Sequence, residues 1–324
     1  MIIVRTPLRI SLVGGGTDMP AFYQRAGFGA VVSFAINKYV YVTINPHFGG
    51  GVRVSYSETE NVARPEDLKH DLIREALLMY GVDDVEVVTV ADIPGNGTGL
   101  GSSSSLSVGL MTGLRRYTGE KDYPGVDARQ AYLLESDFCK HPVGKQDHWA
   151  AAYGGLHYWQ FNTDGEVNNR LLVLTANERL EIERRFILLW TGKTRSANDI
   201  LTAQSEGFSD IDHMRAGMNM RDTAVALRDD LINHNFGRIG DYLNFGWKMK
   251  KTLARGISDS SLDAIYDAGM DAGALGGKLC GAGGGGFFLF YAPPERADAI
   301  VEATGLKRML FGIDTKGSEV VYET

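Results

Sequence analysis

The sequence is poor in the features that mark secreted and membrane proteins. It has two cysteines, Cys139 and Cys280, in 324 residues, which excludes a disulfide framework of the secreted kind but leaves one buried bridge open. It has no apolar run of about 18 residues, the length that spans a membrane. The first residues lack a basic region followed by an apolar stretch, the pattern of a signal peptide. We therefore expect a cytoplasmic protein without a membrane segment.

An excess of positive charge is also lacking. Lysine and arginine number 33 against 40 aspartates and glutamates, for a formal net charge of -7. Nucleic acids and anionic membranes are bound by basic faces, so neither is expected as a partner. A small anionic ligand is still allowed, since a local site can supply backbone amides and a metal. The sequence itself does not decide between a monomer and a homodimer.

The composition, 44% hydrophobic and 23% charged residues, is that of an ordinary globular protein. The length suggests about two domains, which we place at 1–180 and 181–324. Strand and helix patterns occur in both halves, which predicts an α+β protein. Asp18 is placed like a helix N-cap. Hydrophobic periodicity predicts helices at 66–80, 102–117, 128–138, most of 196–270 and near 295–303, and strands at 2–13 (two, around Pro7), 31–34, 39–44, 85–90, 156–161, 171–174, 186–190, 275–280, 286–291 and in a final pair.

Three glycine-rich segments lie far apart, at 14–18, 94–105 and 281–286. The middle one joins a predicted strand to a predicted helix and ends in four serines. This geometry directs backbone N–H groups and the positive end of the helix at the loop, where an oligophosphate would bind. The hydroxyls could cap the helix, bind phosphate or ligate Mg²⁺, and four exceed what a cap needs. The segment therefore predicts a phosphate site.

Two other nucleotide-binding motifs fail on inspection. Gly192-Lys193-Thr194 ends like a P-loop, but Ile187 stands where the first glycine is required. The glycines at 281, 283 and 286 match a dinucleotide fingerprint by letter. The apolar strand 287–290 follows them, however, and not the helix that must receive a pyrophosphate. Neither motif is therefore expected to bind a nucleotide.

All three glycine-rich segments resemble motifs of the galactokinase, homoserine kinase and mevalonate kinase (GHMP) superfamily, in the same order and at similar spacing. Pro94 to Ser105 is similar to the family's phosphate loop, Arg5 to Asp18 to its N-terminal substrate motif, and Lys278 to Gly286 to its C-terminal motif. The resemblance implies a two-domain GHMP fold. Its N-terminal domain would contain a left-handed βαβ crossover, a rare exception, its C-terminal domain would be ferredoxin-like, and the active site would lie between them.

The resemblance also implies site residues. Asp147, in Gly144 to His148, matches the aspartate beside the attacking hydroxyl, and Arg9 would pair with it and offset γ-phosphate charge. Glu135, which alone reads as a structural carboxylate, matches the family's Mg²⁺ ligand, and we expect Ser103 to share that role. The ATP phosphates would be held by the glycine loop and the serine run, namely Gly97, Gly99, Gly101, Ser102, Ser103 and Ser104.

The first motif ends in Gly-Gly-Gly-Thr-Asp and resembles bacterial heptose 7-phosphate kinases and GHMP fucokinases. This likeness implies phosphorylation at C1 of D-glycero-D-manno-heptose 7-phosphate, giving the 1,7-bisphosphate for nucleotide-activated heptose. Lys193 and Arg195 follow a predicted strand and could hold the distal phosphate, although a solvent-facing position fits equally well. The expected acceptor-binding residues are Gly15, Gly16, Thr17, Asp18, Gly283, Gly284, Lys193 and Arg195.

Three alternatives stay open. A kinase for free fucose or a similar hexose is the nearest, since the same motif occurs there. A GHMP-fold decarboxylase is disfavoured by the sugar-type Gly-Gly-Gly-Thr-Asp ending. A catalytically inactive binding protein would have no need of Asp147, Glu135 and the serine run together.

Overall fold

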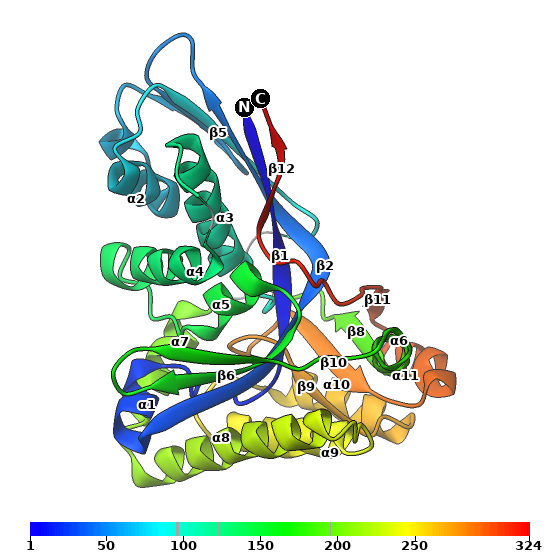
Figure 1. Ribbon diagram of the computed structural model, residues 1–324. Helices are drawn as coiled ribbons and strands as arrows, with labels where there is room; N and C mark the ends of the chain where they lie inside the picture. The colour runs from blue at the N-terminus through cyan, green and yellow to red at the C-terminus, as the bar shows by residue number, and fades with distance from the viewer. Residues whose placement is uncertain (95–96, 122, 195) are drawn as a thin grey trace.

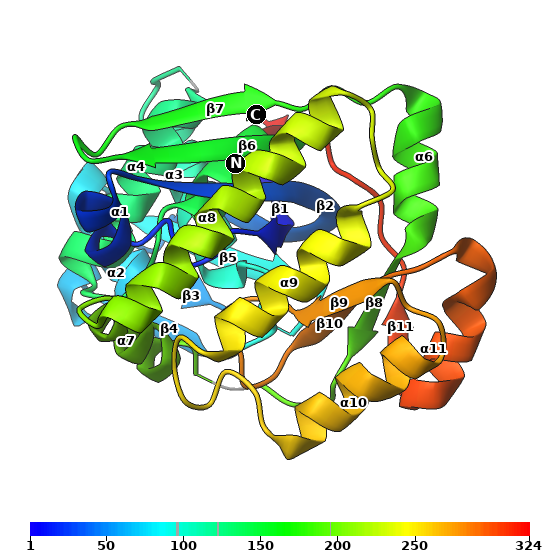
Figure 2. The same ribbon diagram turned by 90° about the horizontal axis from the view of Figure 1, so that it is seen from below.

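The computed structural model describes residues 1–94, 97–121, 123–194 and 196–324. The strands in these ranges form two sheets, one of eight strands and one of four. Helices pack on both sheets (Figure 1). The view from below shows two of them, α8 (Ile211–Ile232) and α9 (Ile239–Lys251), lying across the molecule (Figure 2). Within these ranges, no helix has the length and apolar character needed to cross a membrane.

The first sheet is mixed, with strand order β12-β1-β2-β5-β3-β4, and β6 and β7 extend it from β2. Among the strands in the described ranges, β3 and β5 pair in parallel and the other pairs are antiparallel. The first and last strands are neighbours, so the two termini lie together at one end of the sheet (Figure 1). Its strands are β1 (Ile2–Val13), β2 (Phe28–Pro46), β3 (Val52–Ser55), β4 (Thr59–Val62), β5 (Val85–Ala91), β6 (Leu156–Asn162), β7 (Val167–Leu171) and β12 (Glu319–Glu323).

The two longest strands correct the sequence prediction. Residues 2–13 form one strand and not two, and the separate strands expected at 31–34 and 39–44 are parts of the continuous β2. The pairing of β1 with β2 shifts register directly after Pro7, where β2 contributes extra residues. A proline has no N–H to give to a ladder, so it sits at this irregularity, and the strands bend there without ending.

Beyond the irregularity, β1 places its side chains alternately on two faces. Leu8, Ile10 and Leu12 are buried in a hydrophobic cluster with strands and helices of the C-terminal half. Arg9 and Ser11 therefore point to the opposite face, where both line a cavity. Because side chains alternate between the two faces of β1, its core residues lie on one face and its cavity residues on the other.

Helices cover one face of the first sheet (Figure 1). The central one, α3, packs on β1 and β2. A β-carbon on Gly109 would lie 2.9 Å from the Thr6 hydroxyl, and one on Gly113 would lie 2.8 Å from Ile44, so these glycines allow the helix to approach the sheet closely. The layer contains α2 (Asp71–Tyr80), α3 (Ser102–Tyr117), α4 (Pro124–Leu133), a π-helical turn (Leu134–Phe138) and α5 (Gln146–Tyr153).

The second sheet is antiparallel with order β11-β8-β10-β9. Along the chain, helices connect β8 to β9 and β10 to β11. This connectivity and strand order are those of a ferredoxin-like domain, as predicted. Its strands are β8 (Phe186–Trp190), β9 (Gly276–Leu279), β10 (Phe287–Tyr291) and β11 (Lys307–Met309), and its helices are α7 (Asn198–Gly207), α8 (Ile211–Ile232), α9 (Ile239–Lys251), α10 (Ser260–Asp271) and α11 (Ala297–Thr304).

Several local features differ from the predictions or were not predicted. The helix α6 (Ala176–Arg185), which a capping box between Thr175 and Glu178 initiates, was not predicted. The N-cap of α1 (Pro20–Ala26) is Met19 and not Asp18. The first part of the helix expected at 66–80 is a separate 3₁₀ turn (Pro65–Asp67), and another 3₁₀ turn (Pro294–Arg296) precedes α11.

Strand pairing near the end of the chain also differs from prediction. The final two strands are not partners, since β11 pairs with β8 and β12 pairs with β1. The hairpin of β3 and β4 was not predicted, and β7 lies at 167–171 where 171–174 was expected. The proposed division near residue 180 falls between the two sheets, although β12 belongs to the first sheet. That division stays a prediction.

Candidate active site

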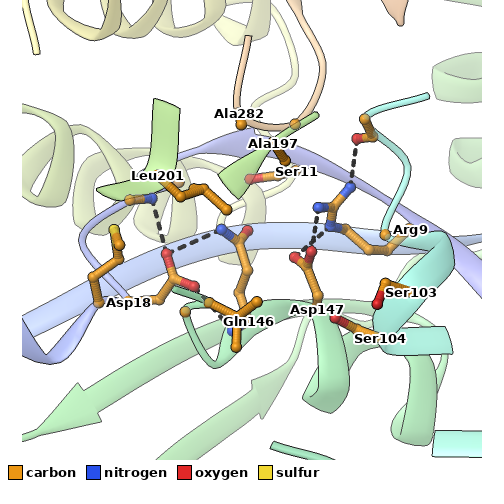
Figure 3. Close-up of a pocket in the computed structure, with 18 of the residues that line it drawn as sticks. Arg9, Ser11, Asp18, Ser103, Ser104, Gln146, Asp147, Ala197, Leu201 and Ala282 are labelled. Carbon is orange, nitrogen blue, oxygen red and sulfur yellow. Dashed lines mark hydrogen bonds and ion pairs between the residues drawn. The ribbon is translucent and has the colours of Figure 1, made fainter. Parts of the chain in front are cut away.

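A cavity of about 180 Å³ lies between the two halves of the molecule (Figure 3). The N-terminal half contributes β1, the turn after it, the glycine loop at 97–101 and the starts of α3 and α5. The C-terminal half contributes α7, α9 and the end of β9 with the turn that follows. Segments far apart in the sequence therefore meet around one cavity.

The glycine loop and the first turn of α3 form one wall of this cavity. Gly99 has a φ of +80°, and a β-carbon there would lie 2.4 Å from the carbonyl oxygen of Cys280, so only glycine fits. The N-cap of α3 is Gly101, and no side chain among the described residues caps the helix. The serines therefore do not cap the helix. Ser102, Ser103 and Ser104 instead line the cavity beside the N-terminus of the helix. The loop residues Gly95 and Asn96 lie outside the described residues.

Arg9 and Asp147 form a bidentate ion pair inside the cavity (Figure 3). Arg9 Nε donates to Asp147 Oδ1 at 2.6 Å and Nη2 donates to Oδ2 at 2.5 Å. The remaining nitrogen, Nη1, donates to the Gly99 carbonyl oxygen at 2.7 Å. Burial disfavours the guanidinium charge, but the Asp147 carboxylate outweighs burial and raises the pKa of Arg9. One arginine therefore fixes Asp147 relative to the glycine loop.

Glu135 lies on the π-helical turn and is almost fully buried. Its Oε1 accepts from Ser107 at 2.8 Å and contacts His148 Nε2 at 3.0 Å, and its Oε2 accepts from Ser103 at 3.1 Å. Burial favours the neutral acid, but the contacts with His148 and the serines outweigh it and lower the pKa of Glu135. A carboxylate that is stabilised in its charged form suits a metal ligand.

The residues around Glu135 fit a magnesium ion. Ser103 and Glu135 present two hard oxygen atoms 3.1 Å apart on the cavity wall. Across the described ranges, no group of three or more His, Cys, Asp or Glu could hold a metal. Magnesium bound with ATP needs only one or two protein oxygens, because phosphates and water supply the remainder. The π-helical turn is typical of functional positions.

The first prediction concerns this pair of oxygens. Ser103→Ala or Glu135→Gln is expected to raise the Mg²⁺ concentration at half-maximal activity, since each variant removes one hard oxygen ligand. The measurement is a Mg²⁺ titration of turnover at fixed nucleotide. Ser136→Ala, on the same π-helical turn, is the matched control. A titration that is unchanged in both variants would refute the assigned ligands.

The first motif is divided between the cavity and the core. Gly15, Gly16 and Asp18 line the cavity. Asp18 is buried and accepts from Gly16 N at 2.8 Å and from Gln146 N and Nε2 at 3.1 and 3.0 Å. Burial, together with the nearby Asp147 carboxylate, raises the pKa of Asp18. Thr17 is fully buried, and its hydroxyl bonds with the backbone of Gly14 and Ala30, away from the cavity lining.

Of the other expected acceptor residues, Gly283, Gly284 and Lys193 do not line the cavity. From the third motif, Gly281 and Ala282 line it where Gly283 and Gly284 were expected. Lys193 is exposed, and its Nζ donates to Ser261 at 2.8 Å. Arg195 lies outside the described residues. The predicted roles of these residues in holding the acceptor therefore stay predictions.

Two buried lysines in the cavity were given no role by the sequence analysis. Lys278 Nζ donates to the carbonyl oxygens of Ser11 and Leu12, at 2.8 and 3.2 Å, and Lys250 Nζ donates to the carbonyl oxygen of Gly281. Burial and the neighbouring Lys250 lower the pKa of Lys278 to about 7, and burial and the nearby Arg9 lower that of Lys250 to about 8. Within the described residues, neither amine forms an ion pair with a carboxylate. Two such cations favour an anionic ligand.

A signal for these lysines exists in the sequence. Lys278 stands in a strand whose other residues are glycine or leucine and are all buried. Lys250 lies seven residues after Leu243 and three after Trp247, on the buried face of α9. A lysine on an otherwise apolar strand or helix face is seldom buried without a partner, and this criterion would have found both.

Comparison with known proteins places the chain in a family. The family description "GHMP kinases N terminal domain" matches residues 69–155, and "GHMP kinases C terminal" matches residues 227–305. The chain belongs to the GHMP kinase family. It is therefore a sugar kinase of the α+β, two-domain GHMP fold, and GHMP kinases use ATP.

Three relatives illustrate the likeness. D-glycero-alpha-D-manno-heptose 7-phosphate kinase of Campylobacter jejuni is 28% identical over 93% of this chain and 92% of its own length. The bifunctional fucokinase/GDP-fucose pyrophosphorylase of Arabidopsis thaliana is 25% identical over 89% of this chain, which spans 30% of that protein. A crystal structure described as D-glycero-D-manno-heptose 1-phosphate kinase from Bacteroides thetaiotaomicron superposes with a TM-score of 0.79 at 22% identity, covering all of both chains. That last likeness shows the fold alone.

Proposed function

We propose that this kinase transfers the γ-phosphoryl group of ATP to the C1 hydroxyl of D-glycero-D-manno-heptose 7-phosphate, with Mg²⁺, and produces the 1,7-bisphosphate. The observation that carries the proposal is the set of hydrogen bonds that Arg9 donates. Two go to the Asp147 carboxylate and one goes to the carbonyl oxygen of Gly99 in the glycine loop. These bonds place a carboxylate beside the loop that would hold the triphosphate. The acceptor is supported by the heptose 7-phosphate kinase relative, which matches along nearly its whole length.

The geometry suggests how phosphoryl transfer proceeds. The triphosphate would lie at the N-terminus of α3, where unpaired backbone N–H groups favour anions. The C1 hydroxyl would approach from the side of Asp18 and give its proton to Asp147 as its oxygen attacks the γ-phosphorus. The bond from the γ-phosphorus to the β,γ-bridging oxygen would break, and ADP would leave. Arg9 and Lys250 would offset the charge on the transferring group. Mg²⁺, held by Ser103 and Glu135, would supply charge neutralisation when bound.

Alignment is the main contribution that these residues can make. Phosphoryl transfer needs little covalent chemistry from the protein, and its rate depends on positioning and on charge stabilisation. Both Asp147 oxygens are held by Arg9, while about a quarter of the side chain, 23%, stays accessible from the cavity. The carboxylate therefore keeps a fixed orientation and still has lone pairs for the acceptor hydroxyl.

A kinase for a free sugar such as fucose is the second candidate. The fucokinase relative matches over 89% of this chain. Lys193, one of the two residues expected to hold a distal phosphate, is bonded to Ser261 and does not line the cavity. This arrangement favours an acceptor without a second phosphate as the alternative to heptose 7-phosphate.

An ADP-release assay against a panel of acceptors tests the proposal. The panel contains D-glycero-D-manno-heptose 7-phosphate, mannose 6-phosphate, fucose, galactose and mevalonate, each with Mg·ATP. Rapid turnover confined to the heptose phosphate is expected. Turnover of fucose or another free sugar would replace the proposed acceptor and keep the kinase reaction. If no acceptor is turned over although ATP still binds, the proposal would be contradicted.

A further inference from the structure

Among the residues that the structure describes, three buried side chains of the cavity have polar atoms without a hydrogen-bond partner. These atoms are Ser11 Oγ, Gln146 Oε1 and both amide atoms of Gln204. The three residues are 5%, 8% and 1% exposed, and all of them line the cavity. They come from β1, α5 and α7, so both halves of the chain contribute. Buried polar groups are nearly always paired, and unpaired ones that line a single cavity indicate a ligand.

The network around Asp18 fixes which atom Gln146 presents to this ligand. Gln146 Nε2 donates to Asp18 Oδ1 at 3.0 Å, while Gly16 N and Gln146 N also donate to the carboxylate. Because both Asp18 oxygens accept, the amide nitrogen of Gln146 must face Asp18 and its carbonyl oxygen is left over. Figure 3 shows Gln146 between Asp18 and Asp147. The free acceptor therefore lies beside the catalytic carboxylate.

The glycine turn after β1 makes room for the other two side chains. A β-carbon on Gly16, whose φ is +105°, would lie 1.9 Å from Gln204 Nε2. A β-carbon on Gly15 would lie 3.1 Å from Ser11 Oγ and 3.3 Å from Gln146 Nε2. Glycine at both positions allows the three polar side chains to converge on one corner of the cavity.

The hydrogen-bonding capacity of this corner identifies the chemistry of its ligand. The carbonyl oxygens of Gln146 and Gln204 require donors, Gln204 Nε2 requires an acceptor, and Ser11 Oγ can be either. An ionised phosphate or carboxylate only accepts, and would leave both carbonyl oxygens unpaired. A hydroxyl group both donates and accepts. A ligand with several neighbouring hydroxyls satisfies the whole set.

We infer that Ser11, Gln146 and Gln204 form the subsite that binds the ring hydroxyls of the acceptor sugar, and that the acceptor's own phosphate lies elsewhere in the cavity. The assignment rests on the proposed function and names the residues that select a polyol. Since Gln204 belongs to α7, the C-terminal half takes part in acceptor selection.

Replacement of Gln204 by methionine, which has a similar length and no polar side-chain amide, tests the subsite. Calorimetry would measure binding of D-glycero-D-manno-heptose 7-phosphate, fucose, ATP and inorganic phosphate, and thermal unfolding would measure the ligand-free protein. The sugar that binds to the wild type should bind to Gln204→Met about tenfold or more weakly, because its hydroxyls lose the Gln204 amide as a hydrogen-bond partner. ATP affinity should change by less than about twofold, and the ligand-free Tm should not fall, because the lost amide had no partner. Gln24→Met, at an exposed position of α1, is the matched control.

The outcomes separate the subsite from the proposed acceptor. If the wild type binds fucose and not the heptose phosphate, the proposed acceptor fails, while weaker fucose binding in Gln204→Met still supports the subsite. Unchanged sugar affinity in both Gln204→Met and Ser11→Ala would overturn the subsite. A fall in Tm together with lost ATP binding would show a structural role for Gln204. Loss of inorganic phosphate binding alone would show that an anion occupies this corner.

Discussion

Replacement of Asp147 by asparagine is expected to lower kcat by about 10²-fold or more and to leave the affinity for ATP nearly unchanged, on the scale of general acid–base catalysis. The carboxylate accepts hydrogen bonds from Arg9 Nε and Nη2, at 2.6 and 2.5 Å. Asparagine keeps the shape, but its amide nitrogen cannot accept from Arg9 or from the sugar hydroxyl. Steady-state kinetics with varied ATP and varied acceptor would measure both effects.

Two further variants control for this result. Asp137→Asn changes an exposed carboxylate on the π-helical turn and should turn over like the wild type. Arg9→Lys keeps one positive charge but loses the bidentate geometry, so it should also lower kcat, because Asp147 is no longer held in place. Turnover of Asp147→Asn at the wild-type rate would remove the carboxylate from the mechanism.

Lys250→Met is expected to lower kcat by about 10²-fold, the scale for removing one group that stabilises developing charge. Lys250 is buried at the cavity wall, and Arg9, Asp18 and Asp147 are close enough to influence its pKa. Its ammonium group is therefore placed beside the transferring phosphoryl group in the proposed reaction. Lys248→Met, at an exposed position of the same helix, is the matched control.

The kinetic parameters decide what Lys250 does. A fall in kcat with an unchanged KM for the acceptor would support charge stabilisation during transfer. A rise in the acceptor KM with kcat unchanged would instead make Lys250 a ligand of the acceptor's phosphate. Wild-type values for both parameters would exclude Lys250 from either role.

The buried lysines also predict a pH dependence. Burial is the main cause that lowers the pKa of Lys278 to about 7 and that of Lys250 to about 8 in the ligand-free protein. Each amine is charged below its pKa and neutral above it, so the cavity loses positive charge as the pH rises from about 6 to about 9. Binding of inorganic phosphate should therefore weaken over this range, and Lys250→Met should flatten its upper part. Calorimetry at several pH values would measure the change, and phosphate affinity that rises with pH would contradict it.

The sequence determined much of the phosphate loop and the secondary structure around it. Gly97 to Ser105 reads as a loop that enters a helix, and α3 begins at Ser102 as predicted. The local order of glycines and serines largely encodes this geometry, because it depends on backbone freedom and on the start of one helix. The strand β5 at 85–91 was predicted from its own local pattern of residues. The ferredoxin-like order of the second half was expected only from the family resemblance.

Only the tertiary structure decided which distant residues meet in the cavity. Arg9 and Asp147 are 138 positions apart, and their pairing could be expected only from the family resemblance. Ser11, Gln204 and the two lysines come from four separate segments, and no local pattern links them. The return of β12 to β1 was likewise not predicted, because hydrophobic periodicity shows that a segment is a strand and not which strand it pairs with. Which side chains meet depends on packing over the whole chain. The sequence alone therefore predicted the motifs, and only the tertiary structure showed which residues contact them.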